Sequence, residues 1–154
     1  MGRVRIALSS DERIGVVELI EPALRRRGHE VTVFGALAET GERGWAWCSA
    51  QAAQAVADGD ADLAIVCCWT GTGASIAANK VPGVRAALCV DAETARGARR
   101  WNDANALALS LRLLSAAVLA EILDIWFATA ASDDADDRAN LAQLAAVESA
   151  APDS

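Results

Sequence analysis

A cysteine followed by a glycine turn is the part of this chain whose residues could do chemistry. In the stretch DLAIVCCWTGTGASIAANK (62–80), Cys68 precedes a turn that contains Gly71 and Gly73. A helix over 74–79 that opens on such a turn directs unpaired N–H groups and the positive end of its dipole outward. A helix terminus of this kind binds an anion without a cationic side chain, and it favours the reactive thiolate form of a nearby cysteine.

The flanking residues indicate how this turn is positioned. The apolar run 63–67 is typical of a strand that is buried on both faces, and Cys68 would be its last residue. In open parallel sheets, ligands bind at the carboxyl ends of the strands. On this stretch alone two interpretations stay open, an anion or polar-ligand site and a merely structural turn. Glycine turns follow many strands, and cysteine is often buried as a small apolar residue.

Strands and helices alternate along the rest of the chain. This alternation predicts an α/β protein with a three-layer, doubly wound parallel sheet of five strands, Rossmann-like and flavodoxin-like, with a C-terminal helix. We expect one domain over 1–148 and a loose tail over 149–154. A first helix would be capped by Ser10 or Asp11 and stopped by Gly28. The first expected strand begins at Val4 and ends near 9–11, and the others are 30–34, 63–68, 84–90 and 106–110. The later helices are expected over 45–57, 74–79, 92–100, 115–127 and 138–147.

Composition narrows the function classes. The net charge of −7 argues against nucleic acid as a partner. No apolar run reaches the roughly 18 residues of a membrane span, and the opening MGRVRIALSS is too short for a signal peptide. The four cysteines have no C-x-x-C spacing and there is one histidine, which predicts no zinc site. Unpaired thiols fit a reducing compartment, so we expect a cytoplasmic protein without a membrane partner.

Residues 68–91, CWTGTGASIAANKVPGVRAALCVD, resemble the signature of the ribose-5-phosphate isomerase B family, which includes the galactose-6-phosphate isomerase subunits. That signature runs roughly Cys-Gly-Thr-Gly-x-Gly, then Ser-Ile-Ala-Ala-Asn-Lys, then Gly-x-Arg-Ala-Ala-Leu. The segments RGHEVTVFG (27–35), AVADGDAD (55–62) and WNDANALAL (101–109) match in the same order. The resemblance implies an aldose–ketose isomerase for a sugar or sugar phosphate, without cofactor or metal. It also implies a homodimer or dimer of dimers with a shared site.

Such an isomerase needs a base for the carbon-bound proton, donors for the enediolate oxygens and a group that carries the hydroxyl proton. The resemblance assigns Cys68 as the base, Thr70 as a helper in proton transfer and Asn102 as a contact to the substrate oxygens. Asp11 matches the aspartate of the family's Ser-Asp-His motif. The backbone amides that would hold the oxyanion belong to Gly71, Thr72, Gly73, Ala74 and Ser75.

Three of these residues have structural alternatives. Thr70 could be only a turn residue, Asn102 only a helix-end cap, and Asp11 only the N-cap of the first helix.

Several positions depart from the family pattern. Trp101 stands where the family has a histidine that opens the sugar ring, and Glu12 replaces the histidine of the Ser-Asp-His motif. The family's C-terminal arginines, which hold the substrate phosphate, fall on Asp136 and Asn140, and only Arg138 lies nearby. These acidic surroundings would repel a phosphate rather than bind it.

The departures suggest a substrate that is already open-chain, or one that is not a cyclic sugar phosphate. A four-carbon sugar phosphate is one candidate. Arg13 could replace the lost phosphate contacts, although most surface arginines are only solvated. The alternative function is a non-catalytic or repurposed family member that binds a sugar-like ligand.

Aromatic and basic side chains complete the candidate site. Sugars stack on indole faces, so four tryptophans could line the pocket, whereas Trp126 is expected in the core. Arg99 or Arg100 could reach a partner's site, or form a solvated face near the end of their helix. The four pocket tryptophans are Trp45, Trp47, Trp69 and Trp101.

Overall fold

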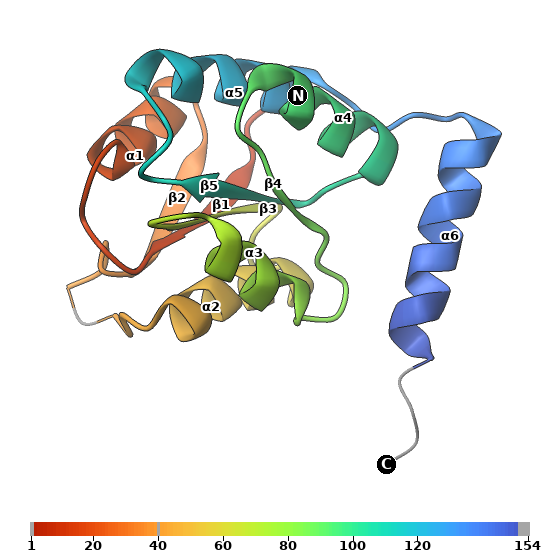
Figure 1. The fold of residues 1–154 in the computed structure, drawn as a ribbon, viewed down its shortest axis with the longest axis horizontal. Coiled ribbons are helices and arrows are strands. Elements are labelled where there is room, and N and C mark those ends of the chain that lie inside the picture. Colours follow the sequence, from red (N-terminus) through yellow and green to blue (C-terminus); the bar gives the residue numbers. More distant parts are fainter. Residues whose placement is uncertain (1, 40, 151–154) are drawn as a thin grey trace.

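The computed structural model describes residues 2–39 and 41–150. Within them, five parallel strands form one sheet in the order β2-β1-β3-β5-β4 (Figure 1). The strands are β1 (Arg5–Ser10), β2 (Glu30–Gly35), β3 (Leu63–Cys68), β4 (Ala86–Leu88) and β5 (Ala106–Ser110). The helices are α1 (Val17–Arg26), α2 (Trp45–Ala57), α3 (Thr72–Asn79), α4 (Ala92–Asn102), α5 (Ala116–Ala128) and α6 (Ala135–Ser149).

Helices cover both faces of the sheet, which confirms the predicted three-layer, doubly wound fold. Helices α1, α4 and α5 lie on one face, and α2 and α3 lie on the other (Figure 1). Side chains of β3 alternate between these layers, so that Cys67 faces the first and Cys68 the second. The second layer is rich in alanine, which lets α2 and α3 approach the sheet closely.

The order of the last two strands differs from the flavodoxin-like arrangement, because β5 lies between β3 and β4. Every residue of β5 is buried, whereas the three residues of β4 are half-buried at the edge. The Asn79 side chain occupies the free edge of β4. Its amide donates to the carbonyl of Ala86 at 2.9 Å and accepts the N–H of Ala86 at 2.8 Å. The observed strand β4 is therefore shorter than the predicted strand 84–90.

The sheet has its switch point between β1 and β3. From β1 the chain goes to β2 on one side, and β3 lies on the other side of β1. At the carboxyl ends, Ser10 pairs in register with Cys67. The crevice outside the carboxyl ends at such a point is where open α/β sheets bind ligands.

The first helix begins later than predicted. Its N-cap is Val16, which makes no side-chain capping bond, so the expected capping by Ser10 or Asp11 is wrong. Residues 11–16 form a loop instead. The Ser10 hydroxyl donates to the Glu12 carbonyl at 2.6 Å, and Gly15 adopts φ +59°, a left-handed conformation that an α-helix excludes.

The last helix extends away from the body of the molecule (Figure 1). It begins three residues earlier than predicted because the Asp134 side chain accepts the Asp136 N–H, and acidic residues in its first turn suit the positive end of the dipole. No residue of α6 is buried. Of the tail expected over 149–154, Ser149 still belongs to α6, and 151–154 lie outside the described residues. Among the described helices, none has the length and apolar character that crossing a membrane requires.

Candidate active site

The thiol of Cys68 lies under the turn that follows β3. Cys68 is 6% exposed, and its Sγ accepts the backbone N–H of Gly71 at 3.2 Å. Gly71 is the N-cap of α3 and has φ +76°. A Cβ at Gly71 would lie 2.5 Å from Leu88 Cδ1 and 2.9 Å from the carbonyl carbon of Leu109. Only glycine therefore fits at this position, and its N–H is held where it can stabilise negative charge on the sulfur.

The first turn of α3 presents the expected anion-binding amides. The Ser75 N–H donates to the Gly71 carbonyl at 3.0 Å. Across residues 2–39 and 41–150, the N–H groups of Thr72, Gly73 and Ala74 donate to no protein acceptor. These three groups and the helix dipole can hold an oxyanion beside Cys68.

Hydrogen bonds tie this turn to the end of β5. The N–H groups of Leu111 and Arg112 donate to the carbonyls of Cys68 and Trp69, both at 3.0 Å. The Ser110 hydroxyl donates to the Trp69 carbonyl at 3.1 Å. Sequence reasoning missed Arg112, an exposed cation held beside the turn. The sequence could have indicated Arg112, because it follows the predicted strand 106–110 by two residues and therefore lies at the same edge of the sheet as Cys68.

Thr70 makes one polar contact that bears on its role. Its hydroxyl lies 2.8 Å from the hydroxyl of Thr72, and both residues are exposed. The pair stands at the open side of the turn, where a bound ligand can exchange hydrogen bonds with it.

The loop after β1 forms the other side of the crevice. Oδ1 of Asp11 is enclosed and has no hydrogen-bond partner within the described part of the chain. Burial raises the pKa of Asp11 above its ordinary value, and the charge of Glu12 raises it further. Arg13 forms an ion pair with Glu18, because its Nε and Nη2 donate to the Glu18 carboxylate at 2.7 and 2.9 Å.

Trp45 walls the amino end of α3. A Cβ at Gly73 would lie 2.9 Å from Trp45 Cε3 and 3.1 Å from Cδ2, so the indole packs directly against this glycine. Trp45, Trp47 and Trp69 are each about half exposed or more. The predicted core position of Trp126 is confirmed, because none of its surface is accessible.

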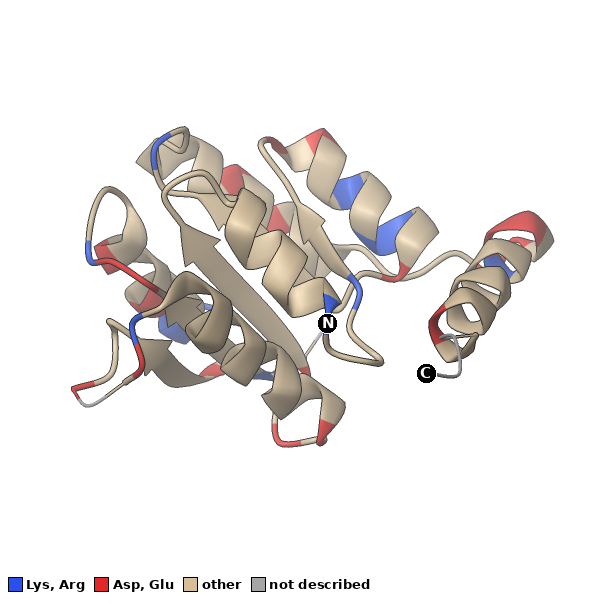
Figure 2. Cartoon of the chain, turned by 60° about the horizontal axis from the view of Figure 1, so that its bottom comes forward, with Lys and Arg blue, Asp and Glu red and all other residues tan. Residues whose placement is uncertain are grey.

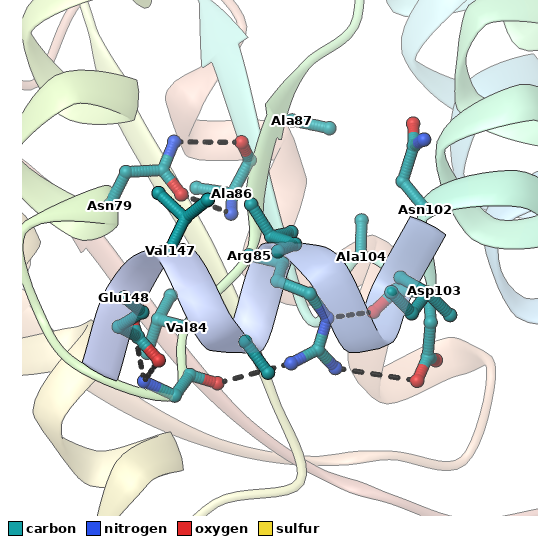
Figure 3. A pocket seen from close by; sticks show the side chains of 14 residues that line it. Asn79, Val84, Arg85, Ala86, Ala87, Asn102, Asp103, Ala104, Val147 and Glu148 are labelled. Carbon is teal, nitrogen blue, oxygen red and sulfur yellow. Dashed lines mark hydrogen bonds and ion pairs between the residues drawn. The ribbon is translucent and has the colours of Figure 1, made fainter. Parts of the chain in front are cut away.

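Three predicted site residues lie elsewhere in the chain. Helix α4 runs back toward the amino ends of the strands, so Trp101 and Asn102 lie at the opposite edge of the sheet from Cys68. Asn102 lines a cavity of about 670 Å³ between α6 and the β4 edge, whose other walls include Arg85 and Asp103 (Figure 3). Arg138 is exposed on α6.

The suggestion that Arg99 reaches a partner's site is wrong. Arg99 is 6% exposed, donates to the Ala104 carbonyl and lies over the Trp126 ring at 5.4 Å from the ring centroid. Burial lowers the pKa of its guanidinium. Of the predicted pair, only Arg100 is exposed. Figure 2 colours the basic residues of α4 blue.

The four cysteines are free and buried. Burial raises the pKa of Cys48 to about 11, and the charge of Asp11 adds to the effect. Within the described ranges, no group of three or more histidine, cysteine or acidic side chains is placed to hold a metal ion.

Comparison with known proteins identifies the family. A model described as Ribose/Galactose Isomerase matches residues 6–144. The chain belongs to this family. It is 36% identical over 128 residues to ribose-5-phosphate isomerase B of Mycolicibacterium paratuberculosis, which covers 82% of this chain and 80% of the relative. The solved ribose-5-phosphate isomerase B of Clostridium thermocellum superposes with a TM-score of 0.84 at 36% identity, over 94% of this chain and 97% of the other.

A further relative is an isomerase named for a different sugar. The 4-deoxy-4-sulfo-D-erythrose isomerase of a Clostridium species is 28% identical over 135 residues, which cover 87% of this chain and 85% of the relative. Other curated relatives reach higher identity, but their matches span only about half of their own length.

In this member of the ribose/galactose isomerase family, the predicted site divides into two parts. The carboxyl edge of the sheet brings together most of the predicted residues around the turn after β3. Trp101, Asn102 and Arg138 remain on α4 and α6. The residues at the carboxyl edge are Asp11, Glu12, Arg13, Trp45, Cys68, Trp69, Thr70, Gly71, Thr72, Gly73, Ala74 and Ser75.

Proposed function

We propose that this chain is an aldose–ketose isomerase that acts through an enediolate on a short, open-chain sugar with an anionic end group. The observation that carries the proposal is the pairing of the Cys68 sulfur with the Gly71 N–H beside three unpaired amides of α3. A thiolate supplies the base and the amides supply the oxyanion site, so both requirements of the reaction meet within one turn.

The proposed reaction uses this turn directly. The Cys68 thiolate removes the proton from the carbon next to the aldehyde, and the electron pair moves onto the carbonyl oxygen. The amides of Thr72, Gly73 and Ala74 hold the resulting charge, and the Thr70 hydroxyl hydrogen-bonds the enediolate. The O2 hydroxyl proton moves to O1, and return of the proton from sulfur to the neighbouring carbon forms the C2=O bond and completes the ketose.

The proposed substrate is a four-carbon sugar phosphate or a sugar of similar length with another anionic end. A four-carbon chain phosphorylated at its last oxygen cannot close the usual ring, so the reaction needs no ring-opening histidine where Trp101 stands. The similarity to a relative named for a sulfonated four-carbon sugar supports this size class. Exposed Arg112 is a better partner for the anionic end than Arg13, because Glu18 already binds Arg13.

A second copy of the chain completes the proposed site. Asn102 lies at the opposite edge from Cys68, so its contact with the substrate requires the Asn102 of another subunit. Helix α6 supports such an assembly, since it buries none of its residues and leaves Leu144 and Val147 48% and 72% exposed. We propose a homodimer or dimer of dimers with shared sites, in which Trp101 and Arg138 also approach the partner's turn. Free, buried thiols suit the proposed cytoplasmic location.

A non-catalytic, sugar-binding role is the second candidate function. Two observations favour it, the 6% exposure of Cys68 and the acidic first turn of α6 in place of the family's phosphate-binding arginines. A bound sugar would then be held by the same amides and tryptophans without proton transfer.

The test follows C2-deuterated D-erythrose 4-phosphate and D-ribose 5-phosphate in water by NMR, with loss of deuterium and formation of ketose as readouts. We expect the wild type to do both, and Cys68→Ala to lose both by at least 100-fold. The matched control is Cys67→Ala, the neighbouring thiol on the other face of the sheet, which is expected to retain both reactions. A shift in unfolding temperature with these sugars, but no exchange, would support the binding role.

A further inference from the structure

The register of the sheet brings the backbone of Asp11 next to that of the proposed base. Ser10, the last residue of β1, pairs in register with Cys67. Asp11 and Cys68 are the next residues along these two neighbouring strands, on either side of the switch point. Both therefore border the crevice in which the substrate would lie.

Structural roles for the Asp11 side chain are taken by other residues. Val16 is the N-cap of α1, and the Ser10 hydroxyl holds the turn through Glu12. The neighbouring cation Arg13 binds Glu18 through two hydrogen bonds. Asp11 neither caps the helix nor forms an ion pair with this arginine.

One oxygen of this carboxyl remains unused. Asp11 Oδ1 is enclosed by the protein and has no partner among the described residues. Enclosing a carboxylate oxygen without a donor is costly, and proteins keep such groups where a ligand or a proton satisfies them. The residue as a whole is only half-buried, so rotation of its side chain would present the carboxyl to a substrate hydroxyl at the edge that carries Cys68.

We infer that Asp11 is a catalytic residue of this isomerase, and that its carboxyl carries the hydroxyl proton between the two oxygens of the enediol. The inference rests on the proposed function, because it assigns a step within that reaction.

The step balances in atoms and charge. As Cys68 takes the C2 proton, the C2–H electron pair forms the C1=C2 bond, and the protonated Asp11 donates its hydrogen to O1. The Asp11 carboxylate then takes the proton from the O2 hydroxyl. The O2–H electrons form the C2=O bond, the C1=C2 pair takes the proton from the Cys68 thiol, and both residues return to their starting states.

The surroundings of Asp11 favour the protonated form of its carboxyl relative to an ordinary aspartate. Burial and the negative charge of Glu12 raise its pKa, and the neighbouring thiols Cys48 and Cys67 supply no positive charge. A carboxyl whose pKa is raised holds its proton more readily than an ordinary carboxyl, as a group that must both give and take a proton requires. Thr70 keeps a supporting role. Its hydroxyl is too weak an acid to give a proton to the enediolate unless it receives another proton at the same time.

The test compares two rates in Asp11→Asn with C2-deuterated D-erythrose 4-phosphate. The amide keeps the size and the hydrogen-bonding capacity of the side chain but cannot cycle a proton. We expect ketose formation to fall by about 100-fold or more. Loss of deuterium from C2 should stay within about tenfold of wild type, because Cys68 and the amides still form the enediolate. Asp60→Asn, an exposed change outside the site, is the control and should alter neither rate.

Each outcome decides the assignment. A parallel fall of both rates would show that Asp11 only holds the substrate, and ketose formation within tenfold of wild type would show that another group carries the proton; either result overturns the role. Because the replaced carboxyl has no partner for its enclosed oxygen, Asp11→Asn should unfold at or above the wild-type temperature. If the wild type itself neither exchanges nor converts the probe sugars, the proposed function fails, and the role of Asp11 with it.

Discussion

The sulfur of Cys68 and the backbone nitrogen of Gly71 are 3.2 Å apart, with the N–H directed at the sulfur. This relationship depends on the left-handed conformation of Gly71 and on the absence of a Cβ there. The backbone of β5 occupies the space that a Cβ would need, at 2.9 Å for the Leu109 carbonyl carbon and 3.0 Å for the Ser110 nitrogen. The donor to the proposed base is therefore positioned by contact with a neighbouring strand.

Gly71→Ala should lower both stability and activity. The left-handed conformation costs an alanine roughly 1–2 kcal/mol, and the contacts with β5 add an overpacking cost of about 1–3 kcal/mol. Because the turn must move to relieve them, the N–H leaves the sulfur, and we expect isomerisation to fall at least about tenfold. Thermal unfolding and deuterium exchange measure the two effects.

The matched control is Gly59→Ala. Gly59 has φ +80°, close to that of Gly71, but a Cβ there meets nothing within 4 Å. The control should lose only the conformational roughly 1–2 kcal/mol and keep its activity. Equal losses of stability in the two variants would contradict the packing argument.

Gly73→Ala should weaken substrate binding through Trp45. The added methyl would overlap the indole at 2.9 Å, so the ring must leave the amino end of α3. We expect KM to rise about tenfold, with a smaller change in kcat, because the proposed site uses Trp45 to contact the substrate and not to move the proton. In Trp45→Ala the same glycine substitution should have little further effect, since the overlap is gone. Additive effects of the two changes on KM would show that the indole and the glycine act independently.

Local patterns in the sequence predicted most of the elements. The buried run ending at Cys68 and the helix Trp45–Ala57 have the boundaries that apolar pattern and flanking glycines indicated. The predicted helix 115–127 agrees with α5 to within one residue, and Ser115 is its N-cap, accepting the Val118 N–H. These features depend on neighbours within a few residues, which is the information that a single sequence carries.

Features that depend on distant neighbours could not be predicted in the same way. The pattern does not say that β5 pairs with β3, because that choice depends on how completely each strand can be buried. The prediction that Asp11 caps the first helix was wrong. Gly15 has a left-handed conformation, so the helix cannot include residues 11–15 and begins after Val16. The motifs suggested Asn102 as a site residue but did not show that it lies at the opposite edge of the sheet from Cys68. A motif identifies a residue type at a position, and it does not say which subunit brings that residue to the site.

Shared sites predict that two inactive variants restore each other. Cys68→Ala and Asn102→Ala should each lose most activity. A mixed dimer would still contain one intact site, made from the Cys68 of one subunit and the Asn102 of the other. After subunits exchange at equal amounts, we expect about a quarter of wild-type activity, because half of the dimers are mixed and each has one working site.

The readout needs two controls. Light scattering must show dimers or larger assemblies for both variants, and mixing either variant with itself should restore nothing. Mixed assemblies without recovered activity would contradict a shared site, and a monomeric wild type with full activity would remove the proposed assembly.

His29 should make the protein less stable in mild acid. Its Nδ1 accepts the backbone N–H of Val4 at 3.2 Å, which requires the neutral ring, and its ring lies against Phe127 with 4.2 Å between centroids. Burial lowers the pKa of His29 below its ordinary value, and the charge of Arg27 lowers it further. Protonation would break the bond to Val4 and place a cation beside Arg27.

The direction of the change in stability with pH follows from whether the folded or the unfolded chain binds the His29 proton more readily. The unfolded chain takes up the His29 proton near pH 6.5, whereas the folded protein does so only at lower pH, so the contribution is complete above pH 6.5 and is lost as pH falls toward the folded pKa. The slope is at most about 1.4 kcal/mol per pH unit for one proton. Urea unfolding from pH 7.5 to 5 should show a steeper loss for the wild type than for His29→Gln, whose amide oxygen can accept the same N–H without titrating. Equal slopes for the two proteins would mean that His29 binds its proton equally well in the folded and unfolded chain, and that burial against Phe127 does not hold the ring neutral.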